Sequence, residues 1–271
     1  EILALLQNIA PLVEKTTIRQ MSQVIFGMLV VSGRITMLGL SRWTEKGGSY
    51  RTIQRFYHSV VGWNAIQWLF FRKRFLKPED EYIVAGDEVV VSKAGKETHG
   101  LDRFFSGIQQ RVIPSLSFFA FSLVNVREER SYPMQVVQVV KSAEEKAASK
   151  VKAEARKTAE KKKRGRPKGS KNKTNKEEVV LNAELLRIQK ALKSLLETIG
   201  TSIHLKYVVL DGHFGNYPSA FMVKQANLDL ISKMRSDVAL YPAFEGEYAG
   251  TGRPAKYAEK INVRQLDPKY L

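Results

Sequence analysis

One thirteen-residue run in the second half of the chain cannot be buried in any fold. Residues 161–173 read KKKRGRPKGSKNK, in which eight residues are Lys or Arg and none has a large apolar side chain. Ordering such a segment costs conformational entropy that no apolar contact offsets. The run is therefore expected to be an exposed connection between two secondary-structure elements. The hydrophobic core is expected to come from the segments on either side.

Basic charge is concentrated in two parts of the chain. The 271 residues include 44 Lys and Arg against 27 Asp and Glu, which gives a formal net charge of +17. Residues 141–176 contribute +11 and residues 1–75 contribute +7, so the remainder is close to neutral. A polyanion is the expected partner of both regions. An anionic membrane is the alternative, but residues 141–176 offer no Trp, Phe or Leu to insert into a bilayer.

The residue types that are absent exclude several kinds of chemistry. The chain has no Cys, which excludes disulfides, thiolate zinc sites and cysteine nucleophiles and fits a reducing compartment. No membrane-spanning run, signal peptide, P-loop or dinucleotide fingerprint is found. We expect an intracellular protein that is not associated with a membrane. Because the chain opens on Glu1 and stops at Leu271 without a terminating pattern, we also expect a fragment.

Residues 1–76 are expected to be helical. Apolar residues recur at helical spacing near the start, and Thr17 is expected to cap a second helix that ends before Gly33. Two further short helices flank the turn TEKGGS, and Arg51 and Arg55 fall on one face of the second. This pattern predicts a helix-turn-helix that binds DNA. An ordinary small helical bundle with a basic, solvated face is the alternative.

From Lys77 onward the pattern changes to strands. Three β-rich runs, EYIVAGDEVVVSK, RVIPSLSFFAFSLVNV and YPMQVVQVV, fill residues 77–140 and are expected to form an antiparallel meander. A basic region, expected to be disordered, follows at residues 141–178. Residues 179–271 then contain an amphipathic helix (EEVVLNAELLRIQKALKSLLETIG), the strand LKYVVLDG, a helix over 218–226 and the strand DLISKMRS. Strands followed by alternating helices and strands predict a mixed α/β fold.

Two carboxylates lie at or near the ends of apolar strands. Asp87 lies within YIVAGDEVVV, and Asp211 follows YVVL where a Gly-rich loop begins. Charges beside such apolar neighbours are costly unless they are compensated, and Mg²⁺ ions would compensate a pair of carboxylates. Two metals about 4 Å apart would activate water and stabilise the leaving oxygen of a phosphodiester. The alternative is that Asp87 starts a turn and Asp211 caps a helix.

Glu88 competes with Asp87 for the role of the first ligand. Successive side chains of a strand point to opposite faces, so only one of the two can face Asp211. The histidines show no metal-ligand spacing and do not complete a Ser-His-Asp pattern.

The order and spacing of several blocks resemble those of cut-and-paste insertion-sequence transposases. These are DDE enzymes with a ribonuclease-H-like core, and the resemblance runs from about residue 50 to residue 257. It is carried by SYRTIQRFYHS, GDEVVVSKAGKETHGLDRFFSG, SLSFFAFSLV, VVLDGHFGNYPSAFM, LISKMRSDVALY and GTGRPAKY. The resemblance implies an α/β fold with a ribonuclease-H-like mixed sheet and flanking helices, preceded by the all-helical region. It also implies a two-metal site for Mg²⁺ or Mn²⁺, with Asp87 and Asp211 as catalytic metal ligands. A bacterial-type cytoplasmic location, associated with the nucleoid, is a further implication of the resemblance.

The third acid of that family, a Glu on a later helix, has no counterpart here. Glu245, Glu247 and Glu259 follow the fifth strand too closely, and none lies in a helical block like that of the family. We therefore expect this chain to bind DNA without completing the catalytic set.

The segment RGRPKG resembles an AT-hook, which lies in the narrow minor groove of A·T-rich DNA. Its DNA-binding residues would be Arg164, Gly165, Arg166, Pro167 and Lys168. Gly permits a close backbone approach, and the negative potential of the groove attracts both arginines. The alternative is a solvated, disordered linker.

These observations together predict a DDE transposase. It would bind transposon ends in double-stranded DNA and catalyse Mg²⁺-dependent strand cleavage and strand transfer, and a homodimer on the DNA is compatible with this interpretation. The alternative is a non-catalytic DNA-binding protein derived from a decayed or domesticated transposase. Composition and pattern alone support a basic α/β protein that binds nucleic acid.

Overall fold

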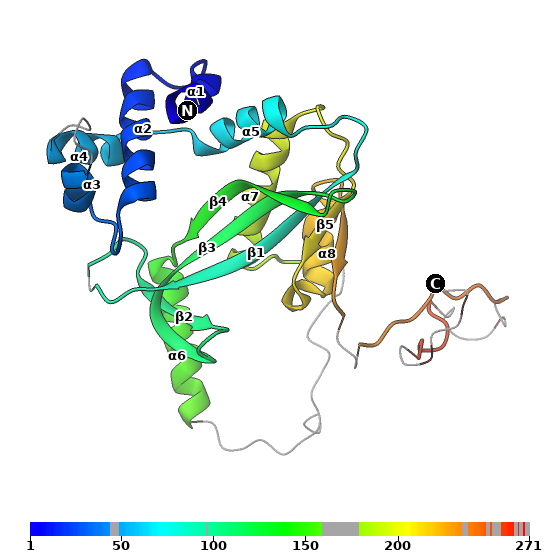
Figure 1. Ribbon diagram of the computed structural model, residues 1–271. Helices are drawn as coiled ribbons and strands as arrows, with labels where there is room; N and C mark the ends of the chain where they lie inside the picture. Colours follow the sequence, from blue (N-terminus) through cyan, green and yellow to red (C-terminus); the bar gives the residue numbers. More distant parts are fainter. Residues whose placement is uncertain are drawn as a thin grey trace.

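The chain folds into a helical N-terminal part and a twisted sheet with helices packed on one of its faces (Figure 1). The computed structural model describes residues 1–43, 49–95, 97–158, 179–234, 238–247, 250, 256–262, 265 and 268. Within these residues, no helix combines the length and apolar character that a membrane span requires.

The N-terminal helices enclose a small core of their own. Amphipathic stripes on the helices place apolar side chains inward at a spacing of three or four residues. The longest of these helices begins at Lys15, with Glu14 in extended backbone (φ −62°, ψ 148°) as its N-cap, so the predicted cap at Thr17 is wrong. The helices are α1 (Ile2–Leu6), the short 3₁₀ helix η1 (Gln7–Ile9), α2 (Lys15–Val30), α3 (Met37–Trp43) and α4 (Tyr50–His58). The buried residues are Ile9, Ile18, Met21, Val24, Leu40, Ile53, Phe56 and Ile66.

Helix α5 (Trp63–Arg74) belongs to both parts of the molecule. Its Ile66 is buried with the N-terminal helices, whereas Trp68 and Phe71 are buried in the core of the sheet. Near its end, the Lys73 Nζ donates a hydrogen bond to the Asn8 carbonyl oxygen at 3.0 Å. The predicted boundary at residue 76 thus follows a helix that the two cores share.

The described strands form one six-stranded mixed sheet, which confirms the α/β, ribonuclease-H-like prediction. The long strand β3 pairs along one edge with β1 and along the other with β2 and then β4, all antiparallel. On the far side of β1, strands β5 and β6 run parallel to it. The strands are β1 (Tyr82–Ser92), β2 (Asp102–Ser106), β3 (Arg111–Asn125), β4 (Arg130–Val139), β5 (Tyr207–Leu210) and β6 (Asp229–Ser232).

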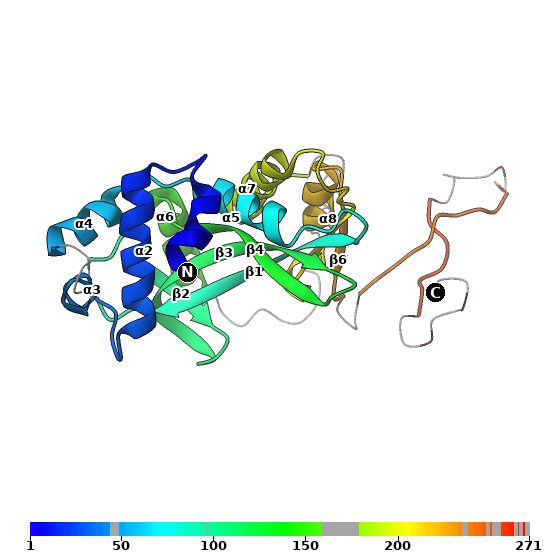
Figure 2. The same cartoon turned by 45° about the horizontal axis from the view of Figure 1, so that its top comes forward.

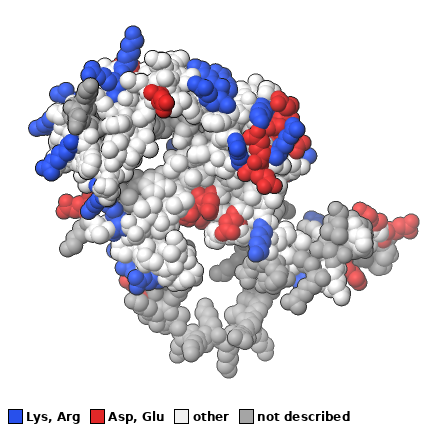
Figure 3. Space-filling model, viewed as in Figure 1, with Lys and Arg blue, Asp and Glu red and all other residues white. Residues whose placement is uncertain are grey.

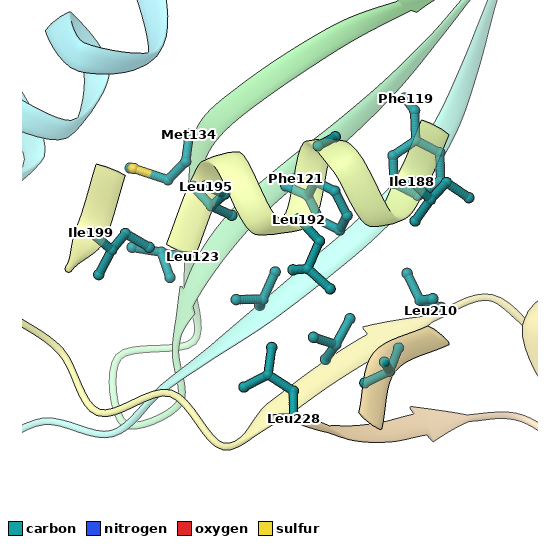
Figure 4. Packing of buried hydrophobic residues seen from close by; sticks show 14 of the residues in the cluster. Phe119, Phe121, Leu123, Met134, Ile188, Leu192, Leu195, Ile199, Leu210 and Leu228 are labelled. Carbon is teal, nitrogen blue, oxygen red and sulfur yellow. The ribbon is translucent and has the colours of Figure 1, made fainter. Parts of the chain in front are cut away.

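One face of the sheet is covered by α7 (Ala183–Ile199) and α8 (Tyr217–Lys224), which Figures 1 and 2 place on the same side. The apolar stripe of α7 packs on alternate residues of the central strands, as Figure 4 shows. The buried side chains include Val84, Phe119, Phe121, Leu123, Leu185, Ile188, Leu192, Leu195, Ile199 and Val208. The alternate residues on the opposite side, Ala85, Phe118, Ala120, Ser122 and Val124, are only half-buried. We call that side the open face.

The basic region at 141–178 was expected to be disordered, and this is wrong for its first part. Residues Ala143–Thr158 form helix α6. Ala, Lys, Glu and Arg are strong helix formers, and Ser142 with Glu145 forms a capping box at its start. The hook-like segment lies outside the described residues.

Gly86 is expected to favour close packing of the side chains over the central strands. A Cβ at this position would lie 2.8 Å from both Leu210 Cδ2 and Phe121 Cε1, inside a close-packed core. Gly86→Ala should lower the free energy of unfolding by about 1–3 kcal/mol, measured by denaturant titration. Gly107→Ala is the matched control because nothing lies within 4 Å of its Cβ position. Equal stability of the two variants would contradict this account of the packing.

Candidate metal centre

The pairing of β1 with β5 brings Asp87 and Asp211 together. Their parallel register joins Val84 to Val208 and Gly86 to Leu210, and each aspartate is the next residue along its strand. Asp211 keeps an extended backbone (φ −57°, ψ 160°), and neighbouring strands lie about 4.8 Å apart. Because Gly86 and Leu210 meet on the α7 side, alternation directs both carboxylates towards the open face.

Each of these carboxylates is only partly engaged by the protein. The Oδ1 of Asp87 accepts a hydrogen bond from the Glu88 amide at 2.8 Å, and the Oδ1 of Asp211 accepts one from the Gly212 amide at 2.6 Å. Across the described residues, neither forms an ion pair with Lys or Arg. Two adjacent carboxylates without a basic partner repel one another and suit a hard divalent cation.

The capping alternative is also partly met. Asp211 is the N-cap of the short helix η2 (Gly212–Phe214). The loop is held further by Ser232, whose hydroxyl donates to the Asp211 carbonyl oxygen at 2.8 Å. A Cβ on Gly215 would come within 2.7 Å of the Lys233 carbonyl oxygen, so this loop requires Gly there. Capping accounts for one carboxylate oxygen of Asp211 and leaves the other free to bind a ligand.

Glu88 lies on the other side of the sheet. It accepts a hydrogen bond from the Ser117 hydroxyl, and Ser117 belongs to the row of β3 residues that faces α7. Its side chain lines a cavity of about 320 Å³ together with Phe104, Phe119 and Arg187. Alternation along β1 therefore separates Glu88 from Asp211 and leaves Asp87 as the neighbour of Asp211.

The described residues supply no third acid beside this pair. No group of three or more His, Asp or Glu side chains able to hold a metal occurs among them. Glu245, Glu247 and Glu259 are exposed and lie outside helices and strands. Figure 1 shows the described C-terminal residues running away from the sheet.

Helix α4 presents the two arginines that the sequence predicts for DNA. Ile53 and Phe56 are buried, while Arg51, Arg55 and His58 line an open groove on the outer side. In Figure 3 Lys and Arg groups lie along the rim over the N-terminal helices, and acidic groups lie both near the middle of the view and on other parts of the surface. The turn at residues 44–48 lies outside the described residues, so the helix-turn-helix stays a prediction.

Helix α6 is fixed to the sheet at its first turn, a feature that we did not predict from the sequence. The Glu145 carboxylate accepts two hydrogen bonds from Arg187 Nη1 of α7, at 2.8 and 3.0 Å. The Nζ of Lys146 lies 3.7 Å from Asp102 Oδ2 of β2, and that of Lys141 lies 3.9 Å from it. The Ser142 amide and then the Arg187 guanidinium hold the pKa of Glu145 below its usual range. The spacing S-x-x-E was the signal that could have revealed this helix start.

The hook-like residues Arg164, Gly165, Arg166, Pro167 and Lys168 lie outside the described residues. Their predicted binding to A·T-rich DNA therefore stays a prediction.

Loss of the Glu145 charge should loosen α6. Glu145→Gln keeps an acceptor for the capping box but weakens the contact with Arg187. Glu145→Ala removes both interactions, so amide hydrogen exchange in α6 should be faster in this variant than in Glu145→Gln. Because the folded-state pKa is lowered, the stabilisation is present above the ordinary pKa of 4.5 and is lost as the pH falls through the lowered value. The neighbouring exposed residue provides the control variant, Glu144→Gln. Exchange that is equally fast in all three variants would contradict the anchoring role.

Comparison with known proteins identifies the family. The family described as DDE superfamily endonuclease matches residues 8–269. Among solved structures, Endonuclease V from Ciona intestinalis in complex with a DNA 24-mer that contains inosine is similar over 66% of this chain and 58% of its own, at 14% identity and a TM-score of 0.29. A variant of that enzyme, bound to a 23-mer, gives the same values. No curated protein sequence matches.

The family match extends over the helical part, the sheet with its two neighbouring aspartates, and the C-terminal segment. The chain belongs to the DDE superfamily endonucleases.

Proposed function

We propose that the protein is an insertion-sequence transposase, which cleaves DNA strands at transposon ends and transfers them to a target. The observation that carries this proposal is the β1–β5 register, which makes Asp87 and Asp211 neighbours on the open face. Helices do not cover that face in the described structure, so a duplex can approach the two carboxylates. Such access is what a nuclease acting on an extended polymer requires.

Asp87 and Asp211 are the residues that would hold Mg²⁺ or Mn²⁺. The ligand type matches these cations, because carboxylate oxygens are the ligands that hard divalent cations prefer. When bound there, metal ions would activate water and stabilise the leaving oxygen of a phosphodiester. The chain itself contributes rigidity: Gly86 packs against Leu210, and the loop after Asp211 is fixed by Ser232, so both carboxylates are preorganised.

The basic regions would bind the duplex around this centre. Arg51 and Arg55 of α4 would contact DNA at the transposon end, and the hook-like segment would enter an A·T-rich minor groove nearby. The net charges of these two regions favour association with a polyanion. A homodimer on the DNA and a bacterial-type cytoplasmic location are compatible with this proposal.

One observation favours a second candidate, a non-catalytic DNA-binding protein derived from a transposase. The described residues place two acids at the centre and no third. Under this alternative the chain binds DNA but does not cut it, with Mg²⁺ or Mn²⁺ present. Metal-dependent cleavage of a linear duplex would exclude it.

Asp87→Asn and Asp211→Asn should each weaken Mn²⁺ binding. The affinity for Mn²⁺ should fall by at least ~10-fold, since that is the smallest loss seen when a residue that only supports a metal ligand is removed. The affinity is measured by electron paramagnetic resonance of free Mn²⁺. Glu88→Gln is the matched control because Glu88 lies on the α7 side. DNA binding should persist in all three variants. If Glu88→Gln loses as much affinity as the other two, the assignment of Asp87 is wrong.

The hook predicts two different effects for two basic residues. Arg166→Ala should remove the preference for A·T-rich over G·C-rich duplexes, because this side chain would reach the groove floor. Lys171→Ala should weaken binding to both duplexes alike and reduce the salt slope by about 1, as for a phosphate contact. Binding is measured by fluorescence anisotropy at several salt concentrations. Equal behaviour of the two variants would indicate an electrostatic tether without groove recognition.

A further inference from the structure

The hairpin formed by β2 and β3 extends the sheet well beyond the two aspartates. Asp87 pairs with Ala120, and the β1–β3 ladder continues to Ser92 and Ser115. From there β2 continues along the other edge of β3, as far as the last pair, Ser106 with Arg111. Figure 1 shows this hairpin projecting at the end of the sheet, near α6.

One side of this hairpin is continuous with the open face. Side chains alternate along β3, so Val112 points to the same side as Ala120 and Asp87. Val112 pairs with Phe105, and both side chains are about half exposed, at 47% and 56%. Val89 of β1 is equally exposed on this side. An apolar track therefore leads from the aspartates towards the end of the hairpin.

The turn of the hairpin presents a single apolar side chain. Ile108 is 96% exposed. The turn around it is held by two hydrogen bonds, from the Gln109 amide to Ser106 Oγ at 3.2 Å and from Gln110 Nε2 to the Gly107 carbonyl oxygen at 2.6 Å. Ile108 is thus carried on a turn whose shape is fixed before any partner binds.

The charges around the turn are basic. Arg103 and Arg111 are exposed on the two strands, and the intervening residues carry no acid. The acid of this hairpin, Asp102, lies beside Lys141 and Lys146. A basic hairpin with exposed apolar side chains is complementary to duplex DNA, because DNA combines negatively charged phosphates with apolar stacked bases.

We propose that the β2–β3 hairpin is a DNA wedge. Its tip enters the minor groove, Ile108 inserts between two base pairs, and Arg103 and Arg111 contact the flanking phosphates. This inference rests on the proposed function, because it takes the duplex to be the one held at Asp87 and Asp211.

The length of the hairpin sets where the wedge acts. Ala120 and Arg111, the last paired residue of β3, are nine residues apart, which is about 31 Å at about 3.4 Å per residue, and Ile108 lies beyond that pair. With base pairs stacked about 3.4 Å apart, the disturbed step lies roughly ten base pairs from the phosphate at the aspartates.

The test uses the whole chain and a linear duplex of about three helical turns, roughly 30 base pairs, with 2-aminopurine bases spread along one strand. Unstacking raises 2-aminopurine fluorescence, so the unaltered chain should increase it on binding. Ile108→Ala should remove most of that increase while changing the dissociation constant, measured by anisotropy, less than the signal. Ile108→Leu should retain it, because Leu also serves as a wedge.

The control is Leu186→Ala, which truncates a side chain that is 52% exposed on α7 and should leave binding and fluorescence unchanged. Thermal melting should be the same for every variant, since Ile108 is not part of either core. If the chain binds DNA without a rise in fluorescence, or if Ile108→Ala keeps the rise, the wedge is overturned and the proposed function stands. If the unaltered chain does not bind DNA, both are overturned.

Discussion

The structure depends on one parallel pairing, that of β1 with β5. These strands are separated in the chain by β2, β3, β4, α6, the basic segment and α7, so their contact closes a long loop. Because Gly86 has no side chain, Leu210 and Phe121 pack directly over the strand. The pairing defines a face covered by α7 and an open face, and it places Asp87 beside Asp211.

The entropy of closing that long loop depends only weakly on its length, which explains why the sheet tolerates so polar an insertion. Closing a loop becomes more expensive only slowly as the loop lengthens, so additional residues between β4 and α7 are tolerated. What the insertion must not do is disturb the elements that it joins. The contact of Glu145 with Arg187 fixes the first turn of α6 to α7, and that of Lys146 with Asp102 fixes it to the sheet.

Most elements of the fold could be predicted, because their apolar patterns are strong and their lengths are distinctive. The strands around Val84, Phe119 and Val208 and the stripe of α7 all appear where the sequence places them. Strand β2 was missed because its five residues include only two apolar ones, and α6 was missed because charge obscured its helical propensity. Register was beyond prediction, since a period of two does not say which residues pair. Only the pairing shows that Asp87, and not Glu88, is beside Asp211.

The distribution of charge adds a constraint on how DNA can bind. Two carboxylates on the open face repel a phosphate, so the centre of that face attracts DNA only when cations neutralise them. Affinity in the absence of metal must then come from the periphery, where Arg51, Arg55, Arg103 and Arg111 are exposed. With this separation, exposed arginines would hold the DNA backbone on either side, and the DNA strand near the two aspartates would bind there only in the presence of metal ions. Under the proposed function, binding and chemistry would fall to different residues, so a chain that lacks one catalytic acid could still bind DNA.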